Sequence, residues 1–134
     1  MDEILVRLVW LRAEHRCEYC QMPHIFSWLG FEIDHIVARK HEGKSTSGNL
    51  ALSCAYDNAF KGSNIAGIDP KSGRLTRLFH PRRHKWHYHF RWNGPILVGQ
   101  TAIGRTTIAV LGINDPMRIE QRQELIEAGL FPLP

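Results

Sequence analysis

The sequence has no long hydrophobic run and few cysteines. No stretch of 18 consecutive apolar residues occurs in the 134 residues, so neither a transmembrane helix nor a membrane partner is expected. The N-terminal residues 1–16 lack the basic and then apolar segments of a secretory signal. Only three cysteines are present, at positions 17, 20 and 54. This odd number, without a signal, argues against a secreted disulfide scaffold and predicts a reducing, cytoplasmic location.

Carboxylates are missing from one long part of the chain. Between Pro70 and Asn114 there is no Asp or Glu, while the rest of the chain carries nine basic and thirteen acidic residues. The eight basic residues of the carboxylate-free stretch are Lys71, Arg74, Arg77, Arg82, Arg83, Lys85, Arg91 and Arg105. Such one-sided positive charge attracts phosphate backbones and indicates a polyanionic partner. The alternative is a solvated basic face without a ligand.

The patterning predicts one α+β domain. Apolar spacing and capping residues predict helices over 2–15, with Asp2 as N-cap, over 55–61, ending at Gly62, over 101–113, and from Pro116 to before Gly129. Alternating or β-branched segments predict strands over 31–36, 50–52 and 74–79 and a hairpin around Asn93-Gly94. Residues 37–48 are polar and are expected to form a loop.

The hairpin carries a striped pattern of aromatic and basic residues. Strict alternation predicts Trp86, Tyr88, Phe90 and Trp92 on one strand face, and His87, His89 and Arg91 on the other. The aromatic face is expected to be core, with base stacking as the alternative. The opposite face is a candidate for phosphate contact. A turn just before the hairpin holds better candidates for contact with nucleic acid: Arg82, Arg83 and Lys85.

Residue types that suit phosphodiester hydrolysis are concentrated between positions 34 and 61. The carboxylate of Asp34 and the amide oxygen of Asn58 are hard ligands of the kind that Mg²⁺ or Mn²⁺ prefers. His35 has an ordinary pKa near 6.5 and is a candidate general base that would activate water. Lys61 follows Asn58 by one helical turn and could hold a phosphate.

The thiols are best explained as zinc ligands. Cys17, Cys20 and Cys54 together with Asp57 could bind Zn²⁺ tetrahedrally. His15 or His24 could replace Asp57 as the fourth ligand. The other alternative is that Asp57 caps the short helix and the thiols are simply buried. A redox role for Cys17-Glu18-Tyr19-Cys20 is disfavoured because no thioredoxin-like βαβ pattern surrounds it.

A second metal site in the histidine-rich segment is also disfavoured. Its histidines alternate between the two faces of the expected strand and have no acidic partner. They are His80, His84, His87 and His89.

These motifs together resemble the HNH endonuclease family of the ββα-metal fold. The segments that carry the resemblance are RAEHRCEYC, FEIDHIVARKHEGKSTSGNLALSC and DNAFKG, with 14 residues from His35 to Asn49 and 9 more to Asn58. The later segments SNIAGIDP, LFHPRRHKWHYHF and IGRTT are similar to a stand-alone bacterial subgroup with its own C-terminal extension.

The resemblance implies one domain over residues 1–134, with a core at about 12–64 and an extension at about 65–134. It also implies a metal-dependent endonuclease that cleaves DNA. His35 would be the general base, Asp34 and Asn58 would hold the catalytic cation, and Asn49 would fix the loop after the first strand. Asp57 stands where many zinc-containing members have a fourth cysteine. The alternative function is a non-catalytic, zinc-stapled module that binds nucleic acid. A protein-interaction domain without nucleic acid is disfavoured by the basic stretch.

Overall fold

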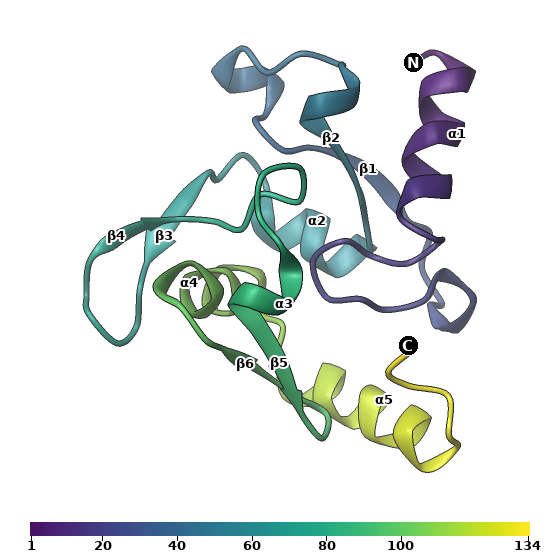
Figure 1. Cartoon of the computed structure of the whole chain (residues 1–134), viewed down its shortest axis with the longest axis vertical. Coiled ribbons are helices and arrows are strands. Elements are labelled where there is room, and N and C mark those ends of the chain that lie inside the picture. Colours follow the sequence, from purple (N-terminus) through teal and green to yellow (C-terminus); the bar gives the residue numbers. More distant parts are fainter.

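The computed structural model describes residues 1–134. The chain forms helices and three small antiparallel sheets, which confirms the α+β class (Figure 1). The helices are α1 (Glu3–Arg12), α2 (Ala55–Lys61), α3 (Trp86–His89), α4 (Ala102–Leu111) and α5 (Pro116–Glu127). The strands are β1 (Glu32–His35), β2 (Leu50–Ser53), β3 (Ala66–Ile68), β4 (Leu75–Arg77), β5 (Phe90–Asn93) and β6 (Ile96–Gly99). They pair as β1–β2, β3–β4 and β5–β6. No helix is long and apolar enough to cross a membrane.

Helix α1 begins where the sequence predicts and ends earlier. The Asp2 carboxylate accepts the Ile4 N–H at 2.8 Å, so the expected N-cap is confirmed. The helix stops at Arg12, not at residue 15, because Glu14 and His15 take left-handed backbone conformations with φ of 55° and 57°. A left-handed residue cannot continue a right-handed helix. The chain then turns into the segment that carries Cys17 and Cys20.

The central unit is the β1–β2 hairpin followed by α2. The antiparallel register places Asp34 opposite Ala51 and His35 opposite Leu50. Cys54 caps α2, since its sulfur accepts the Asp57 N–H at 3.4 Å, and Gly62 follows the last helical residue as predicted. In Figure 1, α2 lies between the hairpin with α1 and the C-terminal half of the chain, and it contacts both β1 and α4.

The C-terminal part packs three elements against α4. Helix α4 contacts β3, β4 and β6, and Thr101 caps it by accepting the Gly104 N–H. Strand β3 was not predicted from the sequence, because Ala66-Gly67-Ile68 is short and has no alternating pattern. Gly67 is needed there: a Cβ at this position would lie 2.4 Å from a methyl group of Val110 on α4. Tertiary packing therefore decides this strand.

The predicted alternation of aromatic residues over 86–92 on one strand face is wrong in its first half. Residues 86–89 form one helical turn, α3, and only Phe90–Asn93 form a strand. Trp86 and Phe90 are therefore helical neighbours, with ring centroids 5.1 Å apart, while Tyr88 is 71% exposed. His89 and Phe90 are buried. The alternation of side chains fails because the chain changes from helix to strand at Phe90. A pattern of aromatic and histidine residues does not indicate that change.

The core lies between the Cys17–Met22 turn, α2 and the C-terminal half. Its apolar members come from both parts of the chain, and the largest fully buried ones include Tyr19, Phe90, Leu97, Leu111 and Ile113. A smaller cluster joins α1 to the hairpin through Val9, Ala13, Leu50 and Leu52. The segment after residue 64 is thus packed onto the same core as the hairpin and α2.

Candidate functional site

Strand β1 sends its last two side chains in opposite directions. Asp34 points inward and is 4% exposed, whereas His35 is half-buried at the edge of the polar loop. The alternation of a β-strand explains the difference, because successive side chains project from opposite faces. Asp34 and His35 therefore occupy different environments, although they are adjacent in the chain.

Asp34 is a buried counter-ion. Its Oδ2 accepts the Tyr19 hydroxyl at 2.6 Å and lies 3.1 Å from Nζ of Lys61. Lys61 Nζ also donates to Oδ1 of Asp34 at 3.2 Å and to the carbonyl oxygens of His35 and Ile36. Burial raises the pKa of Asp34 above its ordinary 3.8, and the charge of Lys61 opposes that rise. The carboxylate is thus engaged on both oxygens.

This placement corrects the expectation for Lys61. Its side chain is 1% exposed and its ammonium is used inside the protein, so it does not present a charge to a phosphate in solution. Lys61 lies one helical turn after Asn58, as the spacing predicts. At this position on α2, however, its side chain points into the protein toward Asp34. Lys61 instead links α2 to β1.

His35 presents its imidazole to the loop that follows β1. Nε2 of His35 lies 2.9 Å from Oγ of Ser45, which also accepts a hydrogen bond from Arg39 at 3.2 Å. Partial burial, and then the positive charge of Arg39, lower the pKa of His35 below its ordinary 6.5. The imidazole is therefore neutral near pH 7. A neutral imidazole can accept a proton, which a general base must do.

Asn49 holds the ends of that loop together. Its Oδ1 accepts the Val37 N–H at 2.8 Å, and its Nδ2 donates to the carbonyl oxygens of Val37 and Lys44 at 3.0 and 2.9 Å. One side-chain amide thus satisfies three backbone groups across residues 37–49. A loop with these bonds keeps Ser45 beside His35.

Asn58 lies on α2, half-buried, three residues before Lys61. Its side-chain amide makes no hydrogen bond within the protein, so its oxygen is available to a ligand. No hydrogen bond links it to Asp34 or His35. The structure therefore brings Asp34 and Lys61 into direct contact, and leaves Asn58 and His35 as separate polar groups on two contacting elements, α2 and β1.

A buried cluster joins three thiols and one carboxylate. The ligand atoms of Cys17, Cys20, Cys54 and Asp57 all lie within 4.8 Å of one another. The Cys17 thiol donates to Oδ2 of Asp57 at 3.1 Å. Hydrogen bonds from Cys17 and Cys54 lower the pKa of the Cys20 thiol well below its ordinary 9.0. Burial raises the pKa of Asp57 to about 7.

The donor set fits a structural Zn²⁺. The sulfur atoms of Cys20 and Cys54 are 3.7 Å apart, close to the edge of roughly 3.8 Å in a tetrahedron with Zn–S bonds of about 2.3 Å. Oδ1 of Asp57 has only the ion pair with Arg118, at 2.9 Å, and no hydrogen bond. A buried carboxylate with one oxygen that lacks a hydrogen bond, beside three thiols, is an arrangement that a cation would satisfy. Neither His15 nor His24 belongs to this cluster.

Two groups next to these sites have no signal in the sequence. Arg118, from α5, lies 2.9 Å from Oδ1 of Asp57 and 3.9 Å from the sulfur of Cys54. The Tyr19 hydroxyl bonds Asp34 from inside the CxxC segment. Both residues reach these sites only because of the tertiary fold. In the sequence, only the hydroxyl of Tyr19 and the charge of Arg118 indicate that each could bond a buried carboxylate.

The three basic candidates of the turn before α3 differ in their surroundings. Arg82 is half-buried and forms an ion pair with Glu18, so its charge is already compensated. Arg83 and Lys85 are exposed and have no ion pair. The expectation of a nucleic-acid contact therefore fits Arg83 and Lys85 better than Arg82.

Two rings of the histidine-rich segment use their Nδ1 atoms within the protein. Nδ1 of His80 accepts the Arg82 N–H, and Nδ1 of His84 accepts the His80 N–H. In each neutral ring the proton must then be on Nε2, which removes the remaining lone pair that a metal would need. This accords with the absence of these residues from the cluster of potential ligands.

Comparison with known proteins identifies one family. Residues 17–64 match the family model described as HNH endonuclease. Comparison with curated proteins and with solved structures gives no significant match. The matched segment includes the thiol cluster, the β1–β2 hairpin and α2, and it confirms the resemblance drawn from the sequence. The similarity to the HNH endonuclease family thus covers residues 17–64, about a third of the chain.

Proposed function

We propose that this protein is an endonuclease that hydrolyses DNA phosphodiester bonds, with His35 as the general base. The observation that carries the proposal is the His35 imidazole, which is half-buried, held by Ser45 and neutral near pH 7. It lies within the segment that matches the HNH family. His35 would take a proton from water, and the resulting hydroxide would attack phosphorus. The expected products carry 5′-phosphate and 3′-hydroxyl ends.

Asn58 is the residue that suits a catalytic cation. HNH nucleases are metal-dependent, and the free amide oxygen of Asn58 suits Mg²⁺ or Mn²⁺. Asp34 does not fit as the second ligand in this arrangement, because Tyr19 and Lys61 already engage its carboxylate and the side chain is buried. Asp34 would reach an ion only after Lys61 has moved away.

Zinc has a structural role in this proposal. Cys17, Cys20, Cys54 and Asp57 would hold it, and Arg118 would offset part of their negative charge. When bound, the ion would stabilise the fold by tying the CxxC turn to the start of α2.

The deciding experiment is cleavage of supercoiled plasmid with Mg²⁺, Mn²⁺ or EDTA. Wild type should relax or linearise the plasmid only with a divalent ion, and His35→Ala should reduce the rate at least about 100-fold, since general-base catalysis contributes 10²–10⁴-fold. His41→Ala, an exposed histidine of the same loop, is the matched control and should cut normally. The ratio of open-circular to linear product distinguishes nicking from double-strand cleavage.

The second candidate is a zinc-stapled module that binds nucleic acid without cutting it. The buried Asp34–Lys61 pair favours it, because that pair leaves no open carboxylate for a catalytic cation. It predicts plasmid that is retarded but uncut, equally for wild type and His35→Ala. That result would reject the endonuclease.

A further inference from the structure

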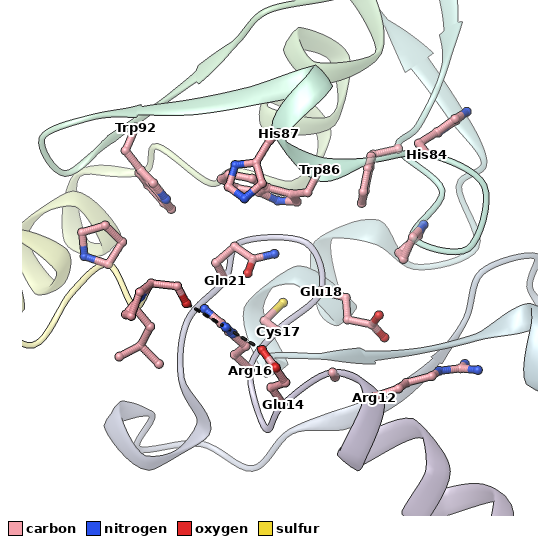
Figure 2. A pocket seen from close by; sticks show the side chains of 16 residues that line it. Arg12, Glu14, Arg16, Cys17, Glu18, Gln21, His84, Trp86, His87 and Trp92 are labelled. Atoms are coloured by element: carbon pink, nitrogen blue, oxygen red, sulfur yellow. Dashed lines mark hydrogen bonds and ion pairs between the residues drawn. The ribbon is translucent and has the colours of Figure 1, made fainter.

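The largest cavity of the molecule has a volume of about 430 Å³ and is separate from the residues proposed for catalysis. Its lining includes none of His35, Asn49 or Asn58. The volume falls in the range of about 300–1,000 Å³ that is usual for small-molecule sites. The cavity lies between the segment after α1, the start of the hairpin β5–β6 and the last residues of the chain (Figure 2).

Two chemically different walls face each other across it. Figure 2 shows Trp86, His87 and Trp92 on one side of the cavity. Arg16 and Gln21, from the turn around Cys17, lie on the other side. One wall is therefore flat and aromatic, and the other carries hydrogen-bonding groups. A planar ligand with a polar edge matches both walls.

The aromatic wall is rigid without any ligand. Nε1 of Trp86 donates to the carbonyl oxygen of Tyr19 at 2.8 Å. The rings of Trp86 and Trp92 lie 6.0 Å apart at 36°, and Trp92 is held by the edge of Phe131 and by the guanidinium of Arg122. Both indoles are half-buried, so part of each ring stays open to the cavity. Ordered rings of this kind lower the entropic cost of stacking a ligand.

The charges of the polar wall are mostly paired, but Arg12 lines the cavity without an ion pair and donates instead to Ser47 and to the Leu50 carbonyl oxygen. Arg16 pairs with Glu14 at 2.6 Å, and Glu18 pairs with Arg82. The amide of Gln21 makes no hydrogen bond, although the left-handed backbone at this residue, with φ of 65°, fixes its position in the turn. A side-chain amide offers one donor and one acceptor side by side, the pattern that matches the edge of a nucleobase.

We propose that this cavity receives one unpaired base of a nucleic acid, stacked on the Trp86–Trp92 wall and read at its edge by Gln21. The exposed cations Arg83 and Lys85 directly precede Trp86 in the chain and suit the adjoining phosphates. This inference rests on the proposed function only in taking nucleic acid as the substrate.

The test is a binding cycle in buffer without added Mg²⁺ or Mn²⁺ and without a chelator, with the zinc-loaded protein and with strands that are checked to remain uncut. The probes are two nine-nucleotide single strands that differ only in the central position, which is 2-aminopurine in one and an abasic site in the other. The variant His87→Ala/Gln21→Leu removes an exposed ring and the free amide and should fold normally. Tyr88→Ala is the matched control, since this exposed aromatic neighbour does not line the cavity.

Wild type should quench 2-aminopurine and bind that strand about five- to a hundredfold more tightly than the abasic strand. The double variant should lose at least fivefold in affinity for the 2-aminopurine strand and bind the abasic strand unchanged. Trp86→Ala should abolish the quenching, and circular dichroism checks its folding. If Trp86→Ala fails to fold, the double variant decides.

Equal binding of both strands by wild type, or equal weakening of both by the double variant, would overturn the base site. These outcomes are distinct from failure of the proposed function. A protein that leaves plasmid uncut but prefers the 2-aminopurine strand keeps the base site and loses the endonuclease. A protein that cuts plasmid with no preference between the strands does the reverse.

Discussion

The pair of Asp34 and Lys61 is the most consequential contact between single residues. Replacement of Lys61 by Met would leave a buried carboxylate without its cation. Loss of one partner of a buried pair typically costs about 3–5 kcal/mol, so we expect Lys61→Met to lower the free energy of unfolding by that amount. Urea unfolding followed by tryptophan fluorescence measures it.

Two further variants make this prediction specific. Lys40→Met changes an exposed lysine of the neighbouring loop and should stay within about 0.5 kcal/mol of wild type. Asp34→Asn combined with Lys61→Met should recover part of the lost stability, because no unpaired buried charge remains. A loss below about 1 kcal/mol for Lys61→Met alone would contradict the buried pair.

His80 makes stability depend on pH. Burial, and then the charge of Arg83, lower its pKa to about 4 from an ordinary 6.5. Between these values the unfolded chain binds a proton that the folded protein does not, so stability falls as pH drops from about 6.5 to 4. Asp57, whose pKa is raised to about 7, changes stability in the opposite direction over this range, so the His80 contribution is measured as the difference between the urea midpoints of wild type and His80→Asn at several pH values. His80→Asn, which keeps an acceptor for the Arg82 N–H, should make the decrease smaller without removing it, because burial also lowers the pKa values of His84 and His89.

At the scale of elements, the thiol cluster joins the CxxC turn, α2 and α5. Cys54 both caps α2 and contacts Arg118 of α5, so a change at the cluster affects three elements together. We expect the purified protein to hold about one zinc per chain and Cys17→Ser to lose zinc and melt at a lower temperature. Metal analysis and thermal unfolding, with and without a strong chelator, check both. Unchanged melting and no zinc in either protein would indicate buried thiols only.

The loop between β1 and β2 depends on one side chain at this same scale. Asn49→Ala removes three hydrogen bonds that close residues 37–49. Because that loop holds Ser45 against His35, we expect slower plasmid cleavage together with a modest loss of stability, about 1–3 kcal/mol. Cleavage at the wild-type rate by a folded Asn49→Ala protein would show that the loop does not position His35.

At the scale of the whole molecule, the carboxylate-free stretch makes charge strongly asymmetric. Arg83 and Lys85 are exposed, unpaired members of this stretch in the turn before α3. If both neutralise DNA phosphates, Arg83→Ala/Lys85→Ala should weaken duplex binding and reduce the slope of log K against log salt by about 1.8. Fluorescence anisotropy across a salt series measures the slope. Arg7→Ala, on exposed α1 and outside the stretch, should leave it unchanged.

Local sequence determined the elements whose signals are local. Helix boundaries depend on caps and turns that involve only near neighbours, here at Asp2, at Cys54 and Gly62, at Thr101 and at Asp115-Pro116. The structure confirms these boundaries to within a few residues. The motif spacing from Cys17 to Asn58 likewise identified the family, because the ligand types and their separations are written in one continuous segment.

Only the tertiary structure decided the partners of these residues. It placed Arg118 beside Asp57, turned Lys61 toward Asp34 and converted half of an alternating segment into α3. It also assembled a cavity from residues far apart in the sequence, such as Arg16 and Pro134, which are in contact although 118 positions separate them. The physical reason is that burial, charge pairing and close packing depend on elements distant in sequence, whereas caps, turns and motif spacings depend on neighbours along the chain.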